Sequence, residues 1–191
     1  MPLLQIVLAS TRPNRSGAAI ASWLAEQATA HGAFAPEVVD LAAVGLPPLD
    51  EPHHPRFGRY TKDHTRAWSA RVRAADAFVF VTPEYNHGPA PALVNALAFL
   101  YAEWTYKAAG LASYGGVSAG TRAAEATKQL LTTLRMVVPP EAVHVPFVDD
   151  AVVDGRLAAG PELALGARAM LDELARLAPA LAPLRPALDH R

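Results

Sequence analysis

Five short apolar runs alternate with stretches of helical periodicity, and this alternation constrains the fold of the chain more than any other feature. Most of the runs are apolar almost throughout, which predicts strands buried on both faces. Strands that alternate with helices in this way are typical of a parallel sheet with helices on both sides. The expected strands are residues 3–9, 34–41, 76–82, 108–114 and 136–147, and the expected helices are residues 20–28, 61–74, 89–104, 118–135 and 163–174.

Composition limits the classes of function. The 17 Lys and Arg residues against 18 Asp and Glu leave a net charge of −1, which argues against a general nucleic-acid binder, because such proteins usually carry a basic excess. The chain has no cysteine, so thiolate nucleophiles and cysteine-ligated metals are excluded. No apolar run reaches the roughly 20 residues needed to span a membrane, and residues 3–9 are too short for a signal-peptide core. We expect a cytoplasmic protein without nucleic-acid or membrane partners.

Ligands of parallel α/β sheets bind beyond the carboxyl ends of the strands. The loop at residues 10–17 joins the first expected strand to a helix start and reads Ser-Thr-Arg-Pro-Asn-Arg-Ser-Gly. Free amides and the dipole at a helix start favour an anion, and the hydroxyls and arginines suit a phosphate monoester. The loop matches neither the P-loop nor the G-x-G-x-x-G pattern. The sequence therefore predicts a phosphate site here, and a helix cap with solvated arginines is the alternative.

Two further loops follow the third and fourth strands, at residues 83–89 and 115–121. In the first of these, Tyr85 offers the face of a ring to a planar ligand, or simply packs in a proline-bounded turn. The other contains Gly116-Val117-Ser118-Ala119-Gly120, the spacing of the hydrolase nucleophile elbow. We favour a glycine turn whose amides face the edge of a cofactor.

Serine hydrolysis through Ser118 stays the alternative interpretation of this last loop. It requires an acid later in the chain, for which Asp149, Asp150 and Asp154 are candidates, and then a histidine. The only later histidine is His190, next to the last residue, where a catalytic base would be poorly positioned.

Metal binding is not expected. His53, His54, His64 and His87 are the histidines that suggest a metal site, but the adjacent His53–His54 pair lies in a proline loop without regular ligand spacing, so we interpret the pair as solvated loop histidines. The arginines and the lysine between residues 56 and 73 are opposed mainly by Asp63 and are typical of a solvated helix face. Attraction of an anionic cosubstrate is the alternative.

In this order, the three loops resemble those of the NAD(P)H-dependent FMN reductase family, flavodoxin-like flavoenzymes that include quinone, azo-dye and chromate reductases. The resemblance covers about residues 3–148. It rests on Ser10-Thr11-Arg12-x-x-Arg15, on Thr82-Pro83-Glu84-Tyr85-Asn86 followed by Pro91-x-Leu93-x-Asn95-Ala96, and on Tyr114-Gly115-Gly116. Ala9 and Ala119 depart from the family pattern, because they stand where glycines are common and narrow the room for backbone approach.

The resemblance implies an α/β flavodoxin-like three-layer sandwich, with a five-stranded parallel sheet in the order 2-1-3-4-5 and helices on both faces. It implies one FMN-binding domain over residues 1–181 and a loose tail over residues 182–191. FMN is expected to bind non-covalently, with its phosphate at the first loop, its ring beside the second and its pyrimidine side against the third. The expected cofactor-binding residues are Ser10, Thr11, Arg12, Arg15, Ser16, Gly17, Pro83, Glu84, Tyr85, Asn86, His87, Tyr114, Gly115, Gly116 and Ser118.

The implied activity passes a hydride from NADPH or NADH through FMN to a small acceptor, such as a quinone or free flavin. The cofactor carries this chemistry, so no catalytic acid–base residue is expected. A non-enzymatic FMN electron carrier or interaction protein is an alternative, although electron carriers of this fold tend to be acidic and this chain is nearly neutral.

The expected helix at residues 89–104 is apolar almost all round. Its main stripe can cover the sheet, which leaves Val94, Ala98 and Phe99 directed elsewhere. A helix of this kind is usually buried on its second face as well. We expect a homodimer that uses this helix beside the flavin, or a tetramer built from two such dimers. The alternative is that Val94 and Phe99 lie under residues 101–110 of the same chain.

Overall fold

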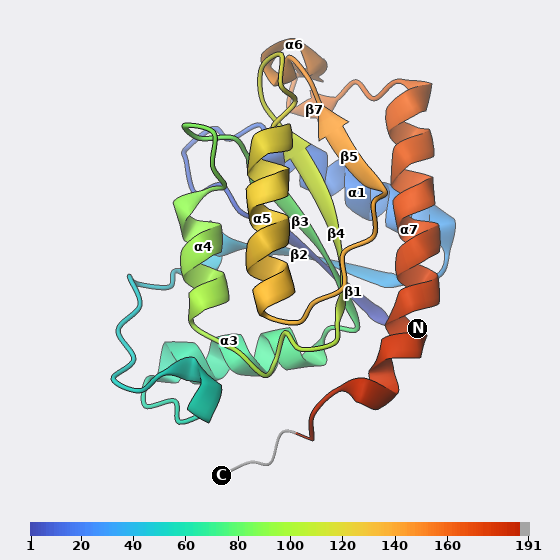
Figure 1. Cartoon of the computed structure of the whole chain (residues 1–191). Coiled ribbons are helices and arrows are strands. Elements are labelled where there is room, and N and C mark those ends of the chain that lie inside the picture. Colours follow the sequence, from blue (N-terminus) through green and yellow to red (C-terminus); the bar gives the residue numbers. More distant parts are fainter. Residues whose placement is uncertain (188–191) are drawn as a thin grey trace.

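Five parallel strands form the central sheet, in the order β2-β1-β3-β4-β5 (Figure 1). The computed structural model describes residues 1–187. The strands are β1 (Leu3–Leu8), β2 (Ala35–Asp40), β3 (Ala77–Pro83), β4 (Ala108–Tyr114) and β5 (Ala142–Val145). The predicted fold class and strand order are confirmed. The last strand is much shorter than expected, because the Pro139–Pro140 pair interrupts it: Val137 forms an isolated parallel bridge with Ala108, and the regular ladder with β4 begins only at Ala142.

Helices and short connecting elements surround the sheet. The helices are α1 (Gly17–His31), α2 (Leu41–Val44), α3 (Asp63–Ala74), α4 (Pro91–Ala98), α5 (Thr121–Thr133), α6 (Val148–Ala151) and α7 (Pro161–Leu181). Two 3₁₀ turns, η1 (Pro55–Phe57) and η2 (Ala182–Leu184), and a hairpin of β6 (Val152–Val153) and β7 (Arg156–Leu157) complete the elements. Neither α6 nor the hairpin is predicted by the sequence pattern; they join the end of β5 to α7.

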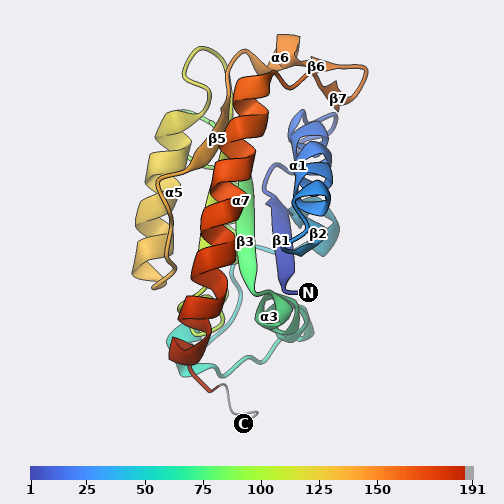
Figure 2. The ribbon, with the colours of Figure 1, turned by 90° about the vertical axis from the view of Figure 1, so that its right-hand side faces the viewer.

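Each face of the sheet has its own apolar core, because successive side chains of a strand point to opposite faces. Leu4 and Ile6 of β1 belong to the core that α1 and α7 cover, whereas Phe78 and Phe80 of β3 lie under α3 and α4. Figure 2 views the molecule from the side on which α7 lies against the sheet. At Gly110 of β4 a Cβ atom would lie 2.6 Å from the sulfur of Met170, so glycine lets α7 pack directly on the strand.

The helix expected at residues 89–104 is shorter in the structure. It ends at Ala98, and the chain then turns so that the buried carboxylate of Glu103 accepts hydrogen bonds from the hydroxyls of Tyr60 (3.0 Å) and Ser69 (2.6 Å). The expectation for Phe99 was wrong. Its side chain is 0% exposed and its ring centroid lies 5.8 Å from that of His64, so it is covered by α3 of the same chain. Val94 is 40% exposed.

The last long helix, α7, continues to Leu181 and contains Pro179 in its final turn. In the segment expected to be a loose tail, η2 follows at once, and Arg185 donates hydrogen bonds to the carbonyl oxygens of Asp76 (2.8 Å) and Tyr106 (3.5 Å). Residues 188–191 of that segment lie outside the described residues, so the division at residue 181 stays a prediction. Among the helices of residues 1–187, none is both long and apolar enough to cross a membrane.

Candidate functional site

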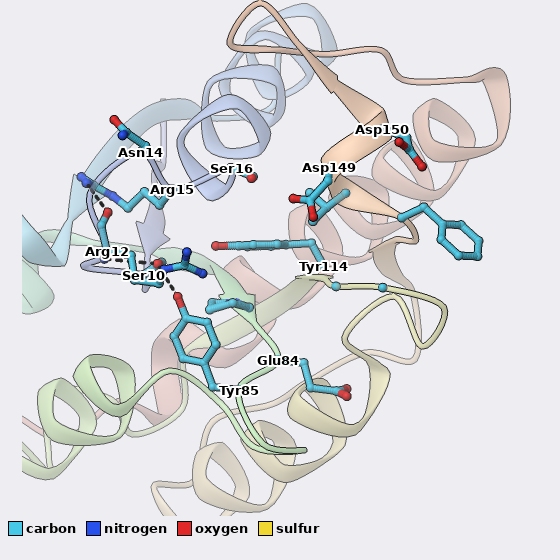
Figure 3. Close-up of a pocket in the computed structure, with 15 residues that line it drawn as sticks. Ser10, Arg12, Asn14, Arg15, Ser16, Glu84, Tyr85, Tyr114, Asp149 and Asp150 are labelled. Atoms are coloured by element: carbon cyan, nitrogen blue, oxygen red, sulfur yellow. Dashed lines mark hydrogen bonds between the residues drawn. The ribbon is translucent and has the colours of Figure 1, made fainter.

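A cavity of about 390 Å³ opens at the carboxyl ends of β1, β3 and β4 (Figure 3). This is the end of the sheet at which α6 lies, opposite the N-terminus of the chain (Figure 1). Ten of the predicted site residues line it: Ser10, Arg12, Arg15, Ser16, Pro83, Glu84, Tyr85, Tyr114, Gly115 and Gly116. The structure therefore brings the three predicted loops together around one space.

The first loop, residues 10–16, runs from the end of β1 to the start of α1. Ser16 is the N-cap residue of α1, but its side chain makes no capping hydrogen bond. Within the described part of the chain, the N–H groups of Ser16 and Gly17 donate to no backbone carbonyl oxygen, and that of Gly17 faces the hydroxyl of Tyr114. Unpaired N–H groups at a helix start attract anions, so this loop keeps the character of an anion site.

The two arginines of this loop have different surroundings. The guanidinium of Arg15 forms an ion pair with Asp40, at the end of β2, and also donates a hydrogen bond to the carbonyl oxygen of Arg12. Arg12 has no ion-pair partner among residues 1–187, and its side chain points toward Ser10 and Tyr85 (Figure 3). Arg12 thus makes no ion pair in this part of the chain, whereas Arg15 holds the loop against β2 and keeps only its buried Nε without a partner.

The second loop is joined to both of the others. The hydroxyls of Tyr85 and Ser10 are 2.8 Å apart and share a hydrogen bond. The Glu84 carboxylate accepts hydrogen bonds from the hydroxyl of Ser118 (3.1 Å) and from the backbone N–H (3.1 Å) and Nε (2.7 Å) of Arg122. The hydrogen bond from the Arg122 side chain is the main cause that lowers the pKa of Glu84. Glu84 thus ties the end of β3 to the start of α5.

Tyr114, at the end of β4, places a buried hydroxyl beside the first loop. The residue is 5% exposed, and its hydroxyl has no partner at full hydrogen-bond geometry in the described structure, although the Ser10 hydroxyl and the Gly17 N–H lie near it. A Cβ atom at position 17 would lie 2.5 Å from this oxygen, so Gly17 gives the ring room to reach between the first loop and α1 (Figure 3). Burial raises the pKa of Tyr114 to about 12, which keeps the hydroxyl protonated and able to donate to a ligand at neutral pH.

The third loop is held by its backbone. The N–H of Gly115 donates to Val145, and the carbonyl oxygens of Gly115 and Gly116 accept from the N–H groups of Val148 and Phe147. In contrast, the N–H groups of Gly116 and Val117 have no partner within residues 1–187. Ala119 and Gly120 both have left-handed φ angles, of 51° and 76°. This turn leaves amide donors at the cavity edge, as the glycine-turn interpretation expects.

Ser118 does not have the surroundings of a hydrolase nucleophile in the described structure. Its hydroxyl donates to Glu84. The histidine that follows it in the described part of the chain, His144, has its Nδ1 2.7 Å from the hydroxyl of the buried Ser113, which in turn donates to the carbonyl oxygen of Ala119. His190, the base that the hydrolase interpretation required, lies outside the described residues.

Five of the predicted residues do not line the cavity. Gly17 and Ser118 act through Tyr114 and Glu84, as described above. Thr11 is exposed, and Asn86 and His87 form an exposed turn with positive φ angles of 50° and 65°. The N–H groups of Tyr85 and Gly88 close this turn by donating to each other's carbonyl oxygens, at 2.9 Å each. These five residues stay predictions as cofactor contacts.

A fourth segment lines the cavity that the sequence analysis did not assign to it. Phe147, Val148, Asp149 and Asp150 follow β5, and Asn14 adds to the first loop. From the sequence, the aspartates are candidates only for the acid of a hydrolase. The end of the fifth strand was a usable signal, because all parallel strands of one sheet end at the same edge. No group of three or more metal-ligating side chains occurs in the part of the chain that the structure describes.

Comparison with known proteins gives the family. The family model of NADPH-dependent FMN reductase matches residues 2–150. A protein of Schizosaccharomyces pombe named NAD(P)H-dependent FMN reductase is 38% identical over 156 residues, which cover 81% of this chain and 78% of that protein. A second protein of that name, from Nectria sp, is 31% identical over 168 residues, or 82% of this chain and 84% of that protein.

Solved structures agree on the fold. The flavoenzyme FerB, an NAD(P)H:(acceptor) oxidoreductase from Paracoccus denitrificans, superposes with a TM-score of 0.75 over 94% of this chain and 98% of its own, at 18% identity. The apo form of the NADH:FMN oxidoreductase EmoB gives a TM-score of 0.71 over 92% of this chain and 89% of its own, at 16% identity. Together with the family model over residues 2–150 and the two relatives, this shows that the chain belongs to the NADPH-dependent FMN reductase family of flavin-dependent oxidoreductases.

Proposed function

We propose that this enzyme binds FMN non-covalently in the cavity and transfers reducing equivalents from NADPH or NADH to a quinone-like or other small acceptor, or to free flavin. One observation carries the assignment of the site: the buried Tyr114 hydroxyl has no partner at full hydrogen-bond geometry and lies beside a helix start whose N–H groups donate to no backbone oxygen. Leaving a buried donor without an acceptor costs free energy of folding. The oxygens of a phosphate ester would accept hydrogen bonds from this hydroxyl and from the neighbouring backbone N–H groups.

The residues present fit the parts of FMN. The N–H groups of Ser16 and Gly17, with Arg12, supply donors and charge for the phosphate. The N–H groups of Gly116 and Val117 supply donors for the polar edge of the ring. When bound, FMN supplies the hydride chemistry, so that the chain itself needs no acid–base pair.

Each loop then has a distinct task toward the cofactor. The Tyr85 hydroxyl, hydrogen-bonded to Ser10, connects the ring side of the cavity to the phosphate side. Glu84 positions the third loop through Ser118 and Arg122 and makes no direct contribution to chemistry. Tyr114 stays protonated at neutral pH and donates to an oxygen of the phosphate or of the ribityl chain.

We also propose that two copies associate through α4. Val94 of this helix is 40% exposed, and the exposed Leu49 lies beside it, because the backbone of Leu49 and Pro47 is hydrogen-bonded to Asn95. Leu49 is 44% exposed. Two large apolar side chains on neighbouring segments favour a self-complementary contact, in place of the contact through Phe99 that the sequence suggested.

The visible spectrum of the purified protein tests the function most directly. We expect bound FMN, which is released on denaturation, and bleaching of the flavin absorbance on anaerobic addition of NADPH or NADH. Riboflavin lacks the phosphate and should bind far more weakly than FMN in a fluorescence titration. Equal affinity for the two flavins would contradict the phosphate site.

Steady-state kinetics test the order of the reaction. We expect ping-pong kinetics, in which the nicotinamide coenzyme leaves before the acceptor enters. Intersecting double-reciprocal plots, indicating a ternary complex of enzyme, coenzyme and acceptor, would contradict this order.

A further inference from the structure

Ser113 of β4 and His144 of β5 form a polar contact that reaches the third loop. The two residues lie opposite each other in the ladder between these strands. Ser113 is 0% exposed, and its hydroxyl lies 2.7 Å from Nδ1 of His144 and 2.8 Å from the carbonyl oxygen of Ala119. A buried hydroxyl that makes both contacts is held in one orientation. The function proposed above gives neither residue a role.

The direction of these two hydrogen bonds follows from the number of protons. A carbonyl oxygen only accepts, so the single proton of the Ser113 hydroxyl is directed to Ala119. The other contact then requires that Nδ1 of His144 donates to the Ser113 oxygen. Burial is the main cause that lowers the pKa of His144, with a further contribution from Lys128 and an opposing one from Glu125. The ring is therefore neutral at pH 7 and carries its proton on Nδ1.

Ala119, which accepts the Ser113 hydrogen bond, has an unfavourable backbone conformation. Its φ is 51°, a left-handed value that costs free energy for residues other than glycine. Such a conformation persists where the surrounding contacts impose it. The carbonyl oxygen of Ala119 is bonded to Ser113, and the N–H of Ala119 donates to the carbonyl oxygen of Gly116 at 3.0 Å. Ser113 thus stabilises a turn that glycine would adopt without such support.

The peptide group between Gly116 and Val117 is the last member of this chain of contacts. Its carbonyl oxygen accepts from Ala119 and also from Phe147, at 3.1 Å. Its N–H, that of Val117, donates to no backbone oxygen within residues 1–187. Hydrogen bonds to the carbonyl of a peptide polarise it and strengthen its N–H as a donor. Because Gly116 lines the cavity, the contacts of Ala119 fix a donor at the cavity edge.

We propose that Ser113 and His144 are positioning residues, which fix the third loop through Ala119 so that its amides stabilise the reduced form of the bound flavin. This inference rests on the proposed function and assigns a role to two residues that do not line the cavity. Hydrogen bonds to a charged acceptor are about twice as strong as those to a neutral one, and reduced FMN is the more negatively charged form. Loss of the positioning should therefore weaken the binding of reduced FMN more than that of oxidised FMN.

The test compares Ser113→Ala with a matched control. Thr127 of α5 is also 0% exposed, and its hydroxyl donates to the carbonyl oxygen of Ala123 at 2.7 Å. Thr127→Val thus removes a buried hydroxyl whose hydrogen bond lies within a helix. We expect Ser113→Ala to lower the preference for reduced over oxidised FMN by about tenfold, which is a fall of about 30 mV in the two-electron midpoint potential. Thr127→Val should keep the wild-type potential, even where urea unfolding shows that both variants lose stability.

Variants of His144 test whether it acts through Ser113. Asparagine places an N–H donor close to the position of Nδ1, so His144→Asn should keep the wild-type potential, whereas His144→Leu, which has no donor, should lower it. In the Ser113→Ala background, His144→Leu should cause no further fall, because the two residues act in one chain of hydrogen bonds. His144 is only partly buried, so its variants also test the proposal if Ser113→Ala does not fold.

Hydrogen exchange in the cofactor-free protein measures the positioning itself. The N–H of Ala119, which bonds Gly116, should exchange about tenfold faster in Ser113→Ala than in wild type. The same N–H should exchange at the wild-type rate in Thr127→Val. Equal exchange of Ala119 in all three proteins would contradict the positioning, whether or not FMN is bound.

The outcomes distinguish this inference from the proposed function. A wild-type protein that binds no FMN contradicts both. A wild-type protein that binds FMN, with the same midpoint potential in Ser113→Ala, contradicts this inference alone. An equal fall in potential in Ser113→Ala and Thr127→Val would assign the effect to a general loss of stability. A further fall on adding His144→Leu to Ser113→Ala would contradict the chain of contacts.

Discussion

Arg12 and Arg15 show how residues three positions apart take different roles. On sequence grounds, both side chains suit a phosphate. In the structure Arg15 is paired with Asp40 and stabilises the conformation of the loop, whereas Arg12 has no ion-pair partner in the described chain. A paired guanidinium has already exchanged part of its hydration for protein contacts. The unpaired one is the better candidate for direct contact with a ligand.

Replacing Arg12 with Ala should weaken FMN binding specifically. A charge-assisted hydrogen bond is worth about 1.5–3 kcal/mol, which corresponds to about a ten- to hundredfold rise in Kd. Riboflavin, which lacks the phosphate, should bind Arg12→Ala and wild type alike. Fluorescence titration with both flavins measures this, and equal losses for FMN and riboflavin would place Arg12 away from the phosphate.

Replacing Ser118 with Ala should leave most of the NAD(P)H-dependent activity. The change removes one hydrogen bond to Glu84, which costs about 0.5–1.5 kcal/mol of unfolding free energy. A nucleophilic serine would instead lose several orders of magnitude of activity on this change. Hydrolysis of a p-nitrophenyl ester by wild type, abolished in Ser118→Ala, would decide in favour of a hydrolase.

At the scale of elements, the Glu84–Arg122 pair joins the end of β3 to the start of α5 and so holds two walls of the cavity together. The Glu84 side chain is 7% exposed and that of Arg122 is 49% exposed. Because the folded state lowers the pKa of Glu84, its contribution to stability is present above the unfolded pKa, near 4.3, and is lost as the pH falls through the folded pKa.

The Glu84→Gln variant tests this contribution. At pH 7 it should be less stable than wild type by about 1–3 kcal/mol in urea unfolding, and the difference should shrink as the pH falls below about 4. The control is Glu125→Gln, whose exposed pair with Lys128 should contribute no more than about 0.5 kcal/mol. A Glu84→Gln effect that does not change between pH 7 and pH 3.5 would mean that the carboxylate charge is not its cause.

At the scale of the whole molecule, α4 and the segment at Leu49 form the apolar surface on which the proposed dimer depends. Folding determines which apolar side chains stay on this surface. Phe99 is covered by α3, whereas Val94 is left exposed. The oligomeric state and the expected cytoplasmic location stay predictions.

The Val94→Glu variant tests the dimer. A charge at a buried interface should weaken association by more than about tenfold, so light scattering should show a fall in mass while the circular dichroism spectrum persists. Val38 of β2 is 41% exposed and lies on a different element, so Val38→Glu should keep the wild-type mass. A wild-type protein that is monomeric at tens of micromolar would contradict the proposal.

Local patterns in the sequence account for the architecture and for most of the cavity lining. Continuous apolar runs such as residues 77–81 must be buried on both faces, and their alternation with helices leaves a parallel sheet as the simplest solution. Since the strand ends of such a sheet share one edge, the loops after β1, β3 and β4 could be expected to meet. Local patterns suffice for these features because hydrophobic periodicity acts over a few residues.

The packing of the elements in three dimensions sets which groups within those loops are free to act. It paired Arg15 with Asp40, tied Glu84 to Arg122, and left the Tyr114 hydroxyl without a partner at full hydrogen-bond geometry. It also ended α4 at Ala98 and brought Phe147 to the cavity rim. Each of these outcomes depends on a partner that is distant in the sequence. Periodicity along the chain carries no information about such partners, because ion pairing and burial are set by the packing of elements against one another.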